Sequence, residues 1–159
     1  MHGLVFVDTN VLLYALDAGV PEKQRVARGW RDALWRRRRG RISYQVLQEF
    51  YVQGYRLSPR AKEKVRAEVH DLLAWDPVVL DQSVLLSAFV VQDDFGLSFW
   101  DSLIVAAAQV GGCEYLLTED LQHGQDLHGL RVVNPFKAGP DDLDARGPGQ
   151  GGAPRSTRS

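Results

Sequence analysis

Residues Leu4–Leu13 read LVFVDTNVLL, an apolar run that stops at an acid, passes through two polar residues and then resumes. The run Leu4–Val7 consists of β-branched, aromatic and aliphatic residues without a polar interruption, which is typical of a strand buried on both faces. The two polar residues after the acid favour turns and helix N-caps, so a helix is predicted over Val11–Leu16. Asp8 therefore lies at the carboxyl end of a strand, where open α/β sheets bind ligands. Taken alone, Asp8 is explained equally well as a helix cap.

Length and composition favour one globular domain. The chain has 159 residues, of which 45% are hydrophobic and 25% charged, and it contains no apolar run of the roughly 20 residues that a membrane span requires. Its one cysteine excludes an intrachain disulfide. The first predicted strand begins within four residues of the amino terminus, which leaves no room for a signal peptide. We therefore expect a cytoplasmic protein with no membrane association.

The net charge of −1 conceals a basic segment between residues 21 and 41. Its basic residues are Lys23, Arg25, Arg28, Arg31, Arg36, Arg37, Arg38, Arg39 and Arg41, against the acids Glu22 and Asp32. A solvated helix face is one explanation of such a run, and contact with a phosphate backbone is the other. We expect RNA binding by the densest part of the segment, Arg36, Arg37, Arg38 and Arg39.

Strand-like and helix-like segments alternate along the chain. Strands are predicted at Leu4–Val7, Arg41–Tyr44, Val78–Leu80, Glu114–Leu117 and Arg131–Val133, with helices between them. This order predicts an α/β fold, a three-layer α/β/α domain with a largely parallel central sheet, over residues 1–137. From residue 138 onward Gly, Pro, Asp, Arg and Ser replace the core-forming residues, so a disordered tail is predicted over 138–159.

A second acid, Glu49, falls on the helix predicted over Gln45–Tyr55. Gln45, Glu49 and Gln53 are spaced by four and form a polar ridge along the border of the apolar stripe. A glutamate in that position is usually a solvated surface residue. A carboxylate beside the apolar stripe is also well placed to face a cleft.

Two more acids lie where a helix begins and a strand ends. Asp101 is the only charged residue in the apolar segment Ser98–Val110, which predicts a central buried helix. The Ser98-x-x-Asp101 spacing is that of a capping box, which gives Asp101 a structural explanation. Glu119 and Asp120 follow the strand predicted at Glu114–Leu117. In a parallel α/β sheet these acids can converge with Asp8 and Glu49 on one edge.

Four clustered carboxylates would repel one another and raise one another's pKa values unless a positive charge lay between them. A divalent cation is the simplest source of that charge. Hard oxygen ligands favour Mg²⁺ or Mn²⁺ over zinc, and such ions keep water positions that phosphate oxygens can occupy. The acids therefore indicate chemistry on phosphate substrates, with an ionised water as the nucleophile.

Four stretches together resemble the acidic motifs of PIN-domain nucleases in order and spacing. They are VDTNVLL at 7–13, VLQEF at 46–50, FWDSLIVAAA at 99–108 and LLTED at 116–120. The similarity runs from about Leu4 to Phe136 and is closest to the VapC-like toxins of bacterial toxin–antitoxin pairs. The resemblance implies an endoribonuclease dependent on one or two Mg²⁺ or Mn²⁺ ions, a cognate antitoxin that covers the groove, and a homodimer.

The resemblance also implies roles for individual residues. The catalytic, metal-binding acids would be Asp8, Glu49, Asp101 and Asp120. The supporting residues would be Thr9, Asn10, Thr118 and Glu119. Asn10 would brace the acids, Thr118 would hold the fourth motif, and Thr9 would contact metal-bound water or phosphate. The fourth motif lacks the frequent following Phe, so Glu119 remains an alternative to Asp120 as the fourth acid.

Three other functions fit less well. A phospho-acceptor receiver domain also gathers acids at strand ends and has a lysine after the last strand, as Lys137 would be. It requires an acidic pair at the first strand end, whereas Asp8 stands alone there. Haloacid-dehalogenase phosphatases need Asp-x-Asp, and residue 10 is Asn. A non-catalytic interaction module would have no use for four acids. Within the PIN-like interpretation, a nuclease of general RNA processing remains an alternative to a toxin.

Overall fold

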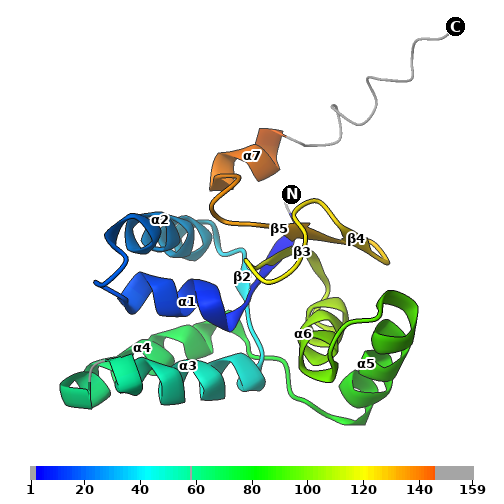
Figure 1. The fold of residues 1–159 in the computed structure, drawn as a ribbon, viewed down its shortest axis with the longest axis horizontal. Coiled ribbons are helices and arrows are strands. Elements are labelled where there is room, and N and C mark those ends of the chain that lie inside the picture. Colours follow the sequence, from blue (N-terminus) through cyan, green and yellow to red (C-terminus); the bar gives the residue numbers. More distant parts are fainter. Residues whose placement is uncertain (1–2, 58, 146–159) are drawn as a thin grey trace, which may run out of the picture.

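A five-stranded sheet lies at the centre of the molecule (Figure 1). The structure is a computed structural model and describes residues 3–57 and 59–145. The strands are β1 (Leu4–Val7), β2 (Gly40–Arg41), β3 (Cys113–Leu117), β4 (Asp126–Leu127) and β5 (Leu130–Val133). Their order is β2-β1-β3-β5-β4, and all neighbours pair in parallel except β4 and β5. The predicted largely parallel sheet is confirmed.

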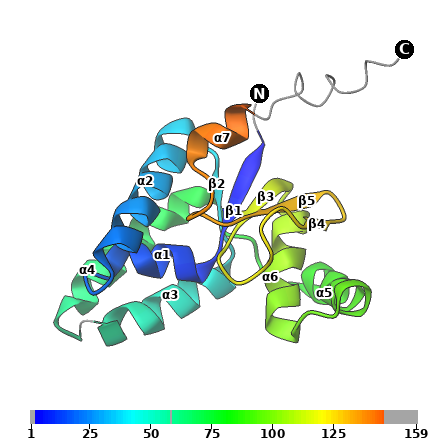
Figure 2. The same ribbon diagram turned by 45° about the horizontal axis from the view of Figure 1, so that its top comes forward.

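Helices cover both faces of this sheet. Their bounds are α1 (Thr9–Leu16), α2 (Pro21–Arg37), α3 (Tyr44–Leu57), α4 (Lys62–Leu72), α5 (Gln82–Phe95), α6 (Phe99–Val110) and α7 (Pro140–Ala145). In both views α1 to α4 lie to one side of the sheet and α5 and α6 to the other (Figures 1 and 2). The three-layer α/β/α arrangement predicted from the sequence is therefore present. No helix within the described ranges combines the length and apolar character needed to cross a bilayer.

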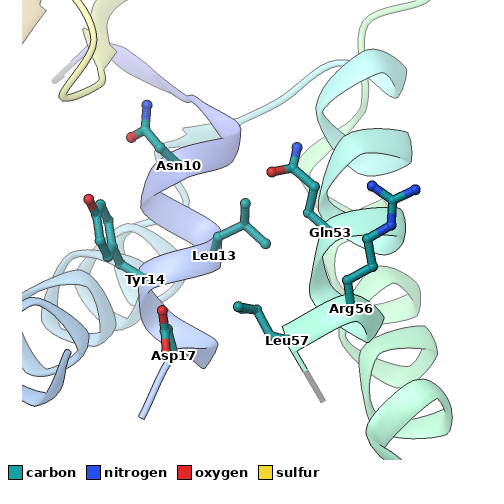
Figure 3. A pocket seen from close by; sticks show the side chains of 7 residues that line it. All are labelled: Asn10, Leu13, Tyr14, Asp17, Gln53, Arg56 and Leu57. Carbon is teal, nitrogen blue, oxygen red and sulfur yellow. The ribbon is translucent and has the colours of Figure 1, made fainter. Parts of the chain in front are cut away.

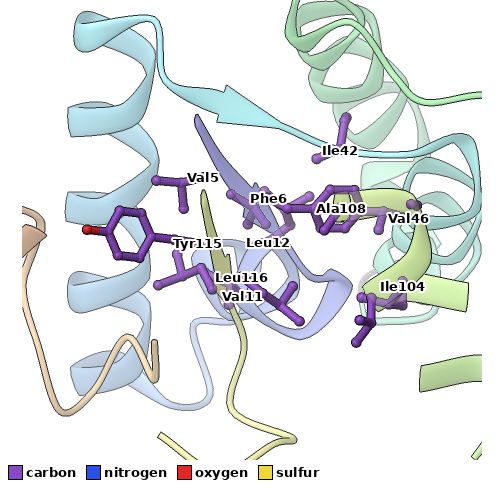
Figure 4. Packing of buried hydrophobic residues seen from close by; sticks show 14 of the residues in the cluster. Val5, Phe6, Val11, Leu12, Ile42, Val46, Ile104, Ala108, Tyr115 and Leu116 are labelled. Carbon is purple, nitrogen blue, oxygen red and sulfur yellow. The ribbon is translucent and has the colours of Figure 1, made fainter. Parts of the chain in front are cut away.

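The core is formed where β1 and β3 meet the helices on either face (Figure 4). Val5, Phe6 and Leu116 are fully buried in the two strands, as an uninterrupted apolar strand requires. Helix α6 is buried over Ser102–Ala108, which fits its apolar residues on almost every side. Burying each large apolar side chain contributes about 1.5–3 kcal/mol, so this packing fixes the positions of the strand ends.

The second predicted strand is shorter than expected, and the third does not form. Strand β2 pairs only at Gly40 and Arg41, because the chain turns into α3 at Tyr44. A side chain at Gly40 would force the Trp75 ring to shift, since a Cβ there would lie 2.5 Å from it. The strand predicted at Val78–Leu80 is wrong: Val78 forms an isolated bridge with Ser43, and the next two residues do not pair.

A short hairpin at the sheet edge was not predicted. Strands β4 and β5 are joined by His128 and Gly129, both with positive φ (55° and 94°). Two-residue turns of this kind connect antiparallel strands and favour glycine. The apolar residues Leu127 and Leu130 on either side of His128-Gly129 are the sequence signal that identifies this turn.

Part of the segment predicted to be disordered forms a helix. Helix α7 forms at Pro140–Ala145, and its Leu143 is only 5% exposed. An ion pair between Arg37 and Asp141 (2.7 Å) joins this helix to the end of α2. The prediction of disorder is therefore wrong for this stretch, while 146–159 lie outside the described residues.

Candidate functional site

Asp8 joins the carboxyl end of β1 to the first turn of α1. Its backbone is extended (φ −76°, ψ 160°), and its Oδ1 accepts the backbone N–H of Thr9 at 2.7 Å. Strand β1 lies between β2 and β3, so its end opens in the middle of the sheet edge. The capping role is real, but it occupies one carboxylate oxygen. The other oxygen, Oδ2, faces residues of the fourth motif.

Thr118 and Asn10 connect the first and fourth motifs through that second oxygen. The Thr118 hydroxyl donates to Asp8 Oδ2 at 2.8 Å and accepts the backbone N–H of Asp120 at 3.0 Å. The Asn10 amide donates to Asp8 Oδ2 at 3.4 Å and to Asp120 Oδ2 at 3.0 Å. Thr118 is fully buried. Two residues predicted to support the site thus hold two of its acids together.

Glu49 lies on α3 and is linked to the same centre through Thr9. The Thr9 hydroxyl donates to Glu49 Oε1 at 2.6 Å, and the Gln45 amide donates to Glu49 Oε2 at 3.3 Å. Along the predicted polar ridge, Gln45 is buried and Glu49 is half-buried next to α1, whereas Gln53 is exposed. Thr9 joins the second motif to the first, which is a more direct role than the contact with water or phosphate that was expected of it.

Asp101 lies in the first turn of α6, and the cap of this helix is Ser98. The backbone N–H of Asp101 donates to Ser98 Oγ at 3.1 Å. This half of the capping box uses the backbone N–H of Asp101, and a side-chain hydrogen bond with Ser98 also lowers the pKa of the Asp101 carboxyl, so the cap involves the carboxylate as well. The neighbouring Trp100 is 65% exposed and lines the same cleft.

Glu119 has its partners outside the acidic cleft. Tyr14 donates its hydroxyl to Glu119 Oε1 at 2.6 Å, and Lys23 forms an ion pair with Glu119 Oε2. The Lys23 ammonium also lies over the rings of Tyr14 and Phe136, at 4.7 and 4.9 Å from their centroids. No sequence pattern predicted this cluster; the spacing of Asn10 and Tyr14 by one helical turn is the signal that could have placed Tyr14 nearby. Of the two candidates for the fourth acid, the geometry favours Asp120.

The acids influence one another's protonation. Burial raises the pKa of Asp8 to about 6; hydrogen bonds from Thr118 and Thr9 oppose the rise, and the charges of Asp120 and Glu49 add to it. Burial also raises the pKa of Asp101, again with contributions from Asp120 and Glu49 and with Ser98 opposing. The charges of Asp120 and Glu49 thus raise the pKa values of both Asp8 and Asp101. Perturbed carboxyl pKa values of this kind are common at functional sites.

All four acids line one cleft of about 210 Å³. The cleft is also lined by Thr9, Asn10, Leu13, Gln45, Gln53, Trp100 and Ile104. Gln45 is 6% exposed, and its Oε1 has no hydrogen-bond partner within the described residues. In residues 3–57 and 59–145, no three His, Cys, Asp or Glu side chains are arranged to hold a metal ion as they stand. The acids share a cleft, and ion binding would require their side chains to turn toward a common point.

The arginines predicted to bind RNA lie at the opposite end of the sheet. They immediately precede β2, which runs parallel to β1, so they lie at the amino ends of the strands while Asp8 lies at a carboxyl end. Arg39 is 5% exposed and donates to the Gly3 carbonyl at 2.9 Å, and Arg37 pairs with Asp141. Arg36 and Arg38 are exposed. The structure does not bring this group to the acidic cleft.

Comparisons with known proteins agree with this fold. The PIN domain profile matches residues 5–125, and no curated protein matches the chain. A toxin–antitoxin complex from Klebsiella pneumoniae contains a chain with a TM-score of 0.59 and 19% identity, over 82% of this chain and 97% of that one. VapBC2 from Rickettsia felis, bound to a fragment of its promoter DNA, gives a TM-score of 0.57 and 15% identity, over 82% and 98%. At such identities these two structures establish likeness of fold. The profile match covers most of the chain, and the chain belongs to the PIN domain family.

Proposed function

We propose that this protein is a Mg²⁺- or Mn²⁺-dependent endoribonuclease that hydrolyses RNA phosphodiester bonds. The observation that carries the proposal is the meeting of four carboxylates, from four separate parts of the chain, in one cleft: Asp8, Glu49, Asp101 and Asp120. The raised pKa values of Asp8 and Asp101 support it, because a cation between the acids would offset the burial and repulsion that raise them.

The residues present fit a hard divalent cation. Every acid in the cleft offers carboxylate oxygens, and the buried Gln45 Oε1 adds a carbonyl oxygen that lacks a donor within the described residues. Mg²⁺ and Mn²⁺ prefer such oxygen ligands, and the described residues of the cleft lining include no histidine or cysteine that would favour zinc. When bound, the ion would supply an ionised water and neutralise charge on the phosphate and leaving oxygen.

The chain itself contributes orientation. Thr118 and Asn10 fix one oxygen of Asp8, while Thr9 fixes one oxygen of Glu49. Fixing these oxygens in advance leaves fewer side-chain torsions to be ordered when ion and substrate bind. The exposed indole of Trp100 stands beside Asp101 at the cleft, where an unpaired base can stack on it. This arrangement favours single-stranded or loop RNA.

We further propose that the protein acts as a toxin restrained by an antitoxin. Support comes from the motif resemblance and from the two structures of similar fold, both of which contain toxin–antitoxin partners. An arginine or lysine of the antitoxin would pair with the carboxylates of the cleft through charge-assisted hydrogen bonds. The same acids would then be unable to bind a cation, so antitoxin and metal should compete.

Cleavage of a single-stranded RNA by the purified protein tests the nuclease. Activity should require Mg²⁺ or Mn²⁺ and stop in excess EDTA. Asp101→Asn should lower kcat at least about a hundredfold with little loss of fold, because Ser98 still caps α6. Asp71→Asn, an exposed acid on α4, is the matched control and should be fully active. Full cleavage in EDTA would refute metal dependence.

The antitoxin proposal needs its own experiment. The product of the neighbouring gene should inhibit RNA cleavage less effectively as the Mg²⁺ concentration rises. Inhibition independent of Mg²⁺ would rule out competition for the acids. A neighbouring product that neither binds nor inhibits would favour the alternative role, a PIN nuclease of general RNA processing.

A further inference from the structure

A second pocket, of about 450 Å³, continues the acidic cleft between α1 and α3 (Figure 3). It shares Asn10, Leu13 and Gln53 with the cleft, so the two form one groove. Along α3 the residues that line the groove are spaced as one helical face: Glu49, Gln53 and Arg56. Seven residues separate the first from the last, roughly 10 Å along the helix axis.

The acidic cleft contains four carboxylates, whereas the described lining of the second pocket includes both a cation, Arg56, and an acid, Asp17. Arg56 is the only cationic side chain among the described residues that line either pocket. It is exposed and has no hydrogen bond or ion pair with any described residue. Asp17, the acid of the second pocket, uses its Oδ1 to accept the backbone N–H of Gly19 at 2.9 Å. The arginine is therefore available for an anionic ligand.

The wall between these polar groups is apolar. Leu13 and Leu57 extend toward each other from α1 and α3, below Gln53 (Figure 3). Arg56 and Gln53 both line this pocket, and the Arg56 side chain runs along α3 so that its guanidinium reaches about the level of Gln53 (Figure 3). The second pocket thus offers a cation and an amide for a phosphate and an apolar surface for a sugar or base.

We propose that Arg56 and Gln53 bind a backbone phosphate of the RNA strand beside the phosphate being cleaved. The inference rests on the proposed nuclease function and adds a second point of attachment for the substrate. A polyanion approaching four carboxylates is repelled, and a planar guanidinium that binds phosphate with two hydrogen bonds offsets this repulsion next to the site. The same charge disfavours a cationic antitoxin tail in this part of the groove. The RNA strand would then run from the acidic cleft along the groove between α1 and α3.

Binding of fluorescent single-stranded RNA tests the proposal without cleavage. The chain carrying Asp101→Asn is compared with the same chain also carrying Arg56→Ala, Arg56→Lys or Arg60→Ala, over a salt series in Mg²⁺. Arg56→Ala should weaken binding about tenfold and flatten the log–log salt dependence by about one unit. Arg56→Lys should keep the salt dependence but lose part of the affinity. Arg60, exposed beyond the end of α3 and outside both pockets, is the matched control and should change neither.

A single neutral methylphosphonate, moved along the RNA, locates the contact. At one position other than the scissile phosphate, the methylphosphonate should weaken RNA binding by the protein that has Arg56. At the same position it should have no further effect on binding by Arg56→Ala. Unchanged affinity and salt dependence in Arg56→Ala, while the wild-type protein still cleaves RNA with Mg²⁺, would overturn this inference and leave the nuclease standing. A wild-type protein that neither binds nor cleaves RNA would overturn both. Equal, Arg56-dependent binding of a polyglutamate peptide would also overturn it, as the groove would then be a docking site for acidic protein segments.

Discussion

The hydroxyl of Thr118 donates a 2.8 Å hydrogen bond to Oδ2 of Asp8, joining residues that lie 110 positions apart in the sequence. Both follow parallel strands, β3 and β1, which are direct neighbours in the sheet. Register places the two strand ends side by side, because Val7 pairs with Leu117. The pairing of the two strands thus positions Thr118 next to Asp8, and the hydrogen bond orients the Asp8 carboxylate.

Thr118→Val removes this donor while keeping the side-chain shape. We expect the free energy of unfolding to fall by about 1–3 kcal/mol, because buried Asp8 and the backbone N–H of Asp120 each lose a partner. The rate of RNA cleavage should fall. The acid limb of its pH–rate profile should move to higher pH, because the hydrogen bond from Thr118 lowers the pKa of Asp8 and the variant lacks it. Urea unfolding and a pH–rate profile measure both effects. Thr118→Ser keeps the hydroxyl and is the control; a fully active Thr118→Val protein would contradict this role.

The raised pKa of Asp8 predicts that stability falls as pH rises. The folded protein holds the Asp8 proton to about pH 6, whereas an ordinary aspartate releases it near 3.8. Between these values the folded state binds more protons, so the free energy of unfolding decreases with rising pH, by about 3 kcal/mol in total. Asp101, whose pKa is also raised, acts in the same direction.

Urea unfolding in EDTA from about pH 4 to pH 7 measures this loss. The difference between wild type and Asp8→Asn isolates the contribution of Asp8, because the other titrating groups are common to both proteins. Added Mg²⁺ should reduce the difference at neutral pH, since a bound cation favours the charged carboxylate. If the free energies of unfolding of the two proteins changed with pH in parallel, burial would not raise the pKa of Asp8.

The fourth motif gives a direct comparison of two adjacent acids. Asp120→Asn should abolish most RNA cleavage, since Asp120 lines the cleft and binds Asn10. Glu119→Gln should keep most of it, because Glu119 pairs with Lys23 and Tyr14 outside the cleft. Cleavage rates corrected for folded protein measure both variants. The reverse ranking would assign the fourth acid to Glu119.

The arginines before β2 predict a dependence on RNA length. Arg36→Ala combined with Arg38→Ala should leave the salt dependence of binding to a short oligonucleotide unchanged, because these residues lie at the other end of the sheet. A long RNA that reaches around the molecule should show a salt dependence flattened by about one to two units. Flattening with the short RNA would mean that these arginines contact the strand held at the cleft.

The acids could be predicted from the sequence because each lies at a local boundary. A strand end marks Asp8 and Asp120, a helix start marks Asp101, and a polar ridge marks Glu49. Parallel strands then bring these boundaries to one edge. The partners of Glu119 could not be predicted, since nothing local relates Lys23 to a residue 96 positions later.

The position of the basic segment was open to prediction from topology. A segment that directly precedes a parallel strand must lie at the amino end of the sheet, away from the acids at the carboxyl ends. Composition showed that residues 36–39 are basic, but strand direction decides where that charge lies. Arg56 could not be singled out from the sequence, because a single arginine near a helix end is common and its proposed role depends on the groove between α1 and α3.

An exposed apolar face on α5 predicts how two copies of the chain associate. Leu86, Phe89 and Val90 are spaced by three and four residues and are 51%, 46% and 56% exposed. Faces of this kind on a globular protein commonly mark interfaces, and a homodimer is the assembly that the motif resemblance implies. The double variant Leu86→Glu with Phe89→Glu should place like charges across a two-fold contact and give a folded monomer. Sedimentation equilibrium measures the mass, and Ala67→Glu, at an exposed position on α4, is the control for added charge. A wild-type monomer at all concentrations would refute the dimer, and an undiminished dimer in the double variant would place its interface on another face.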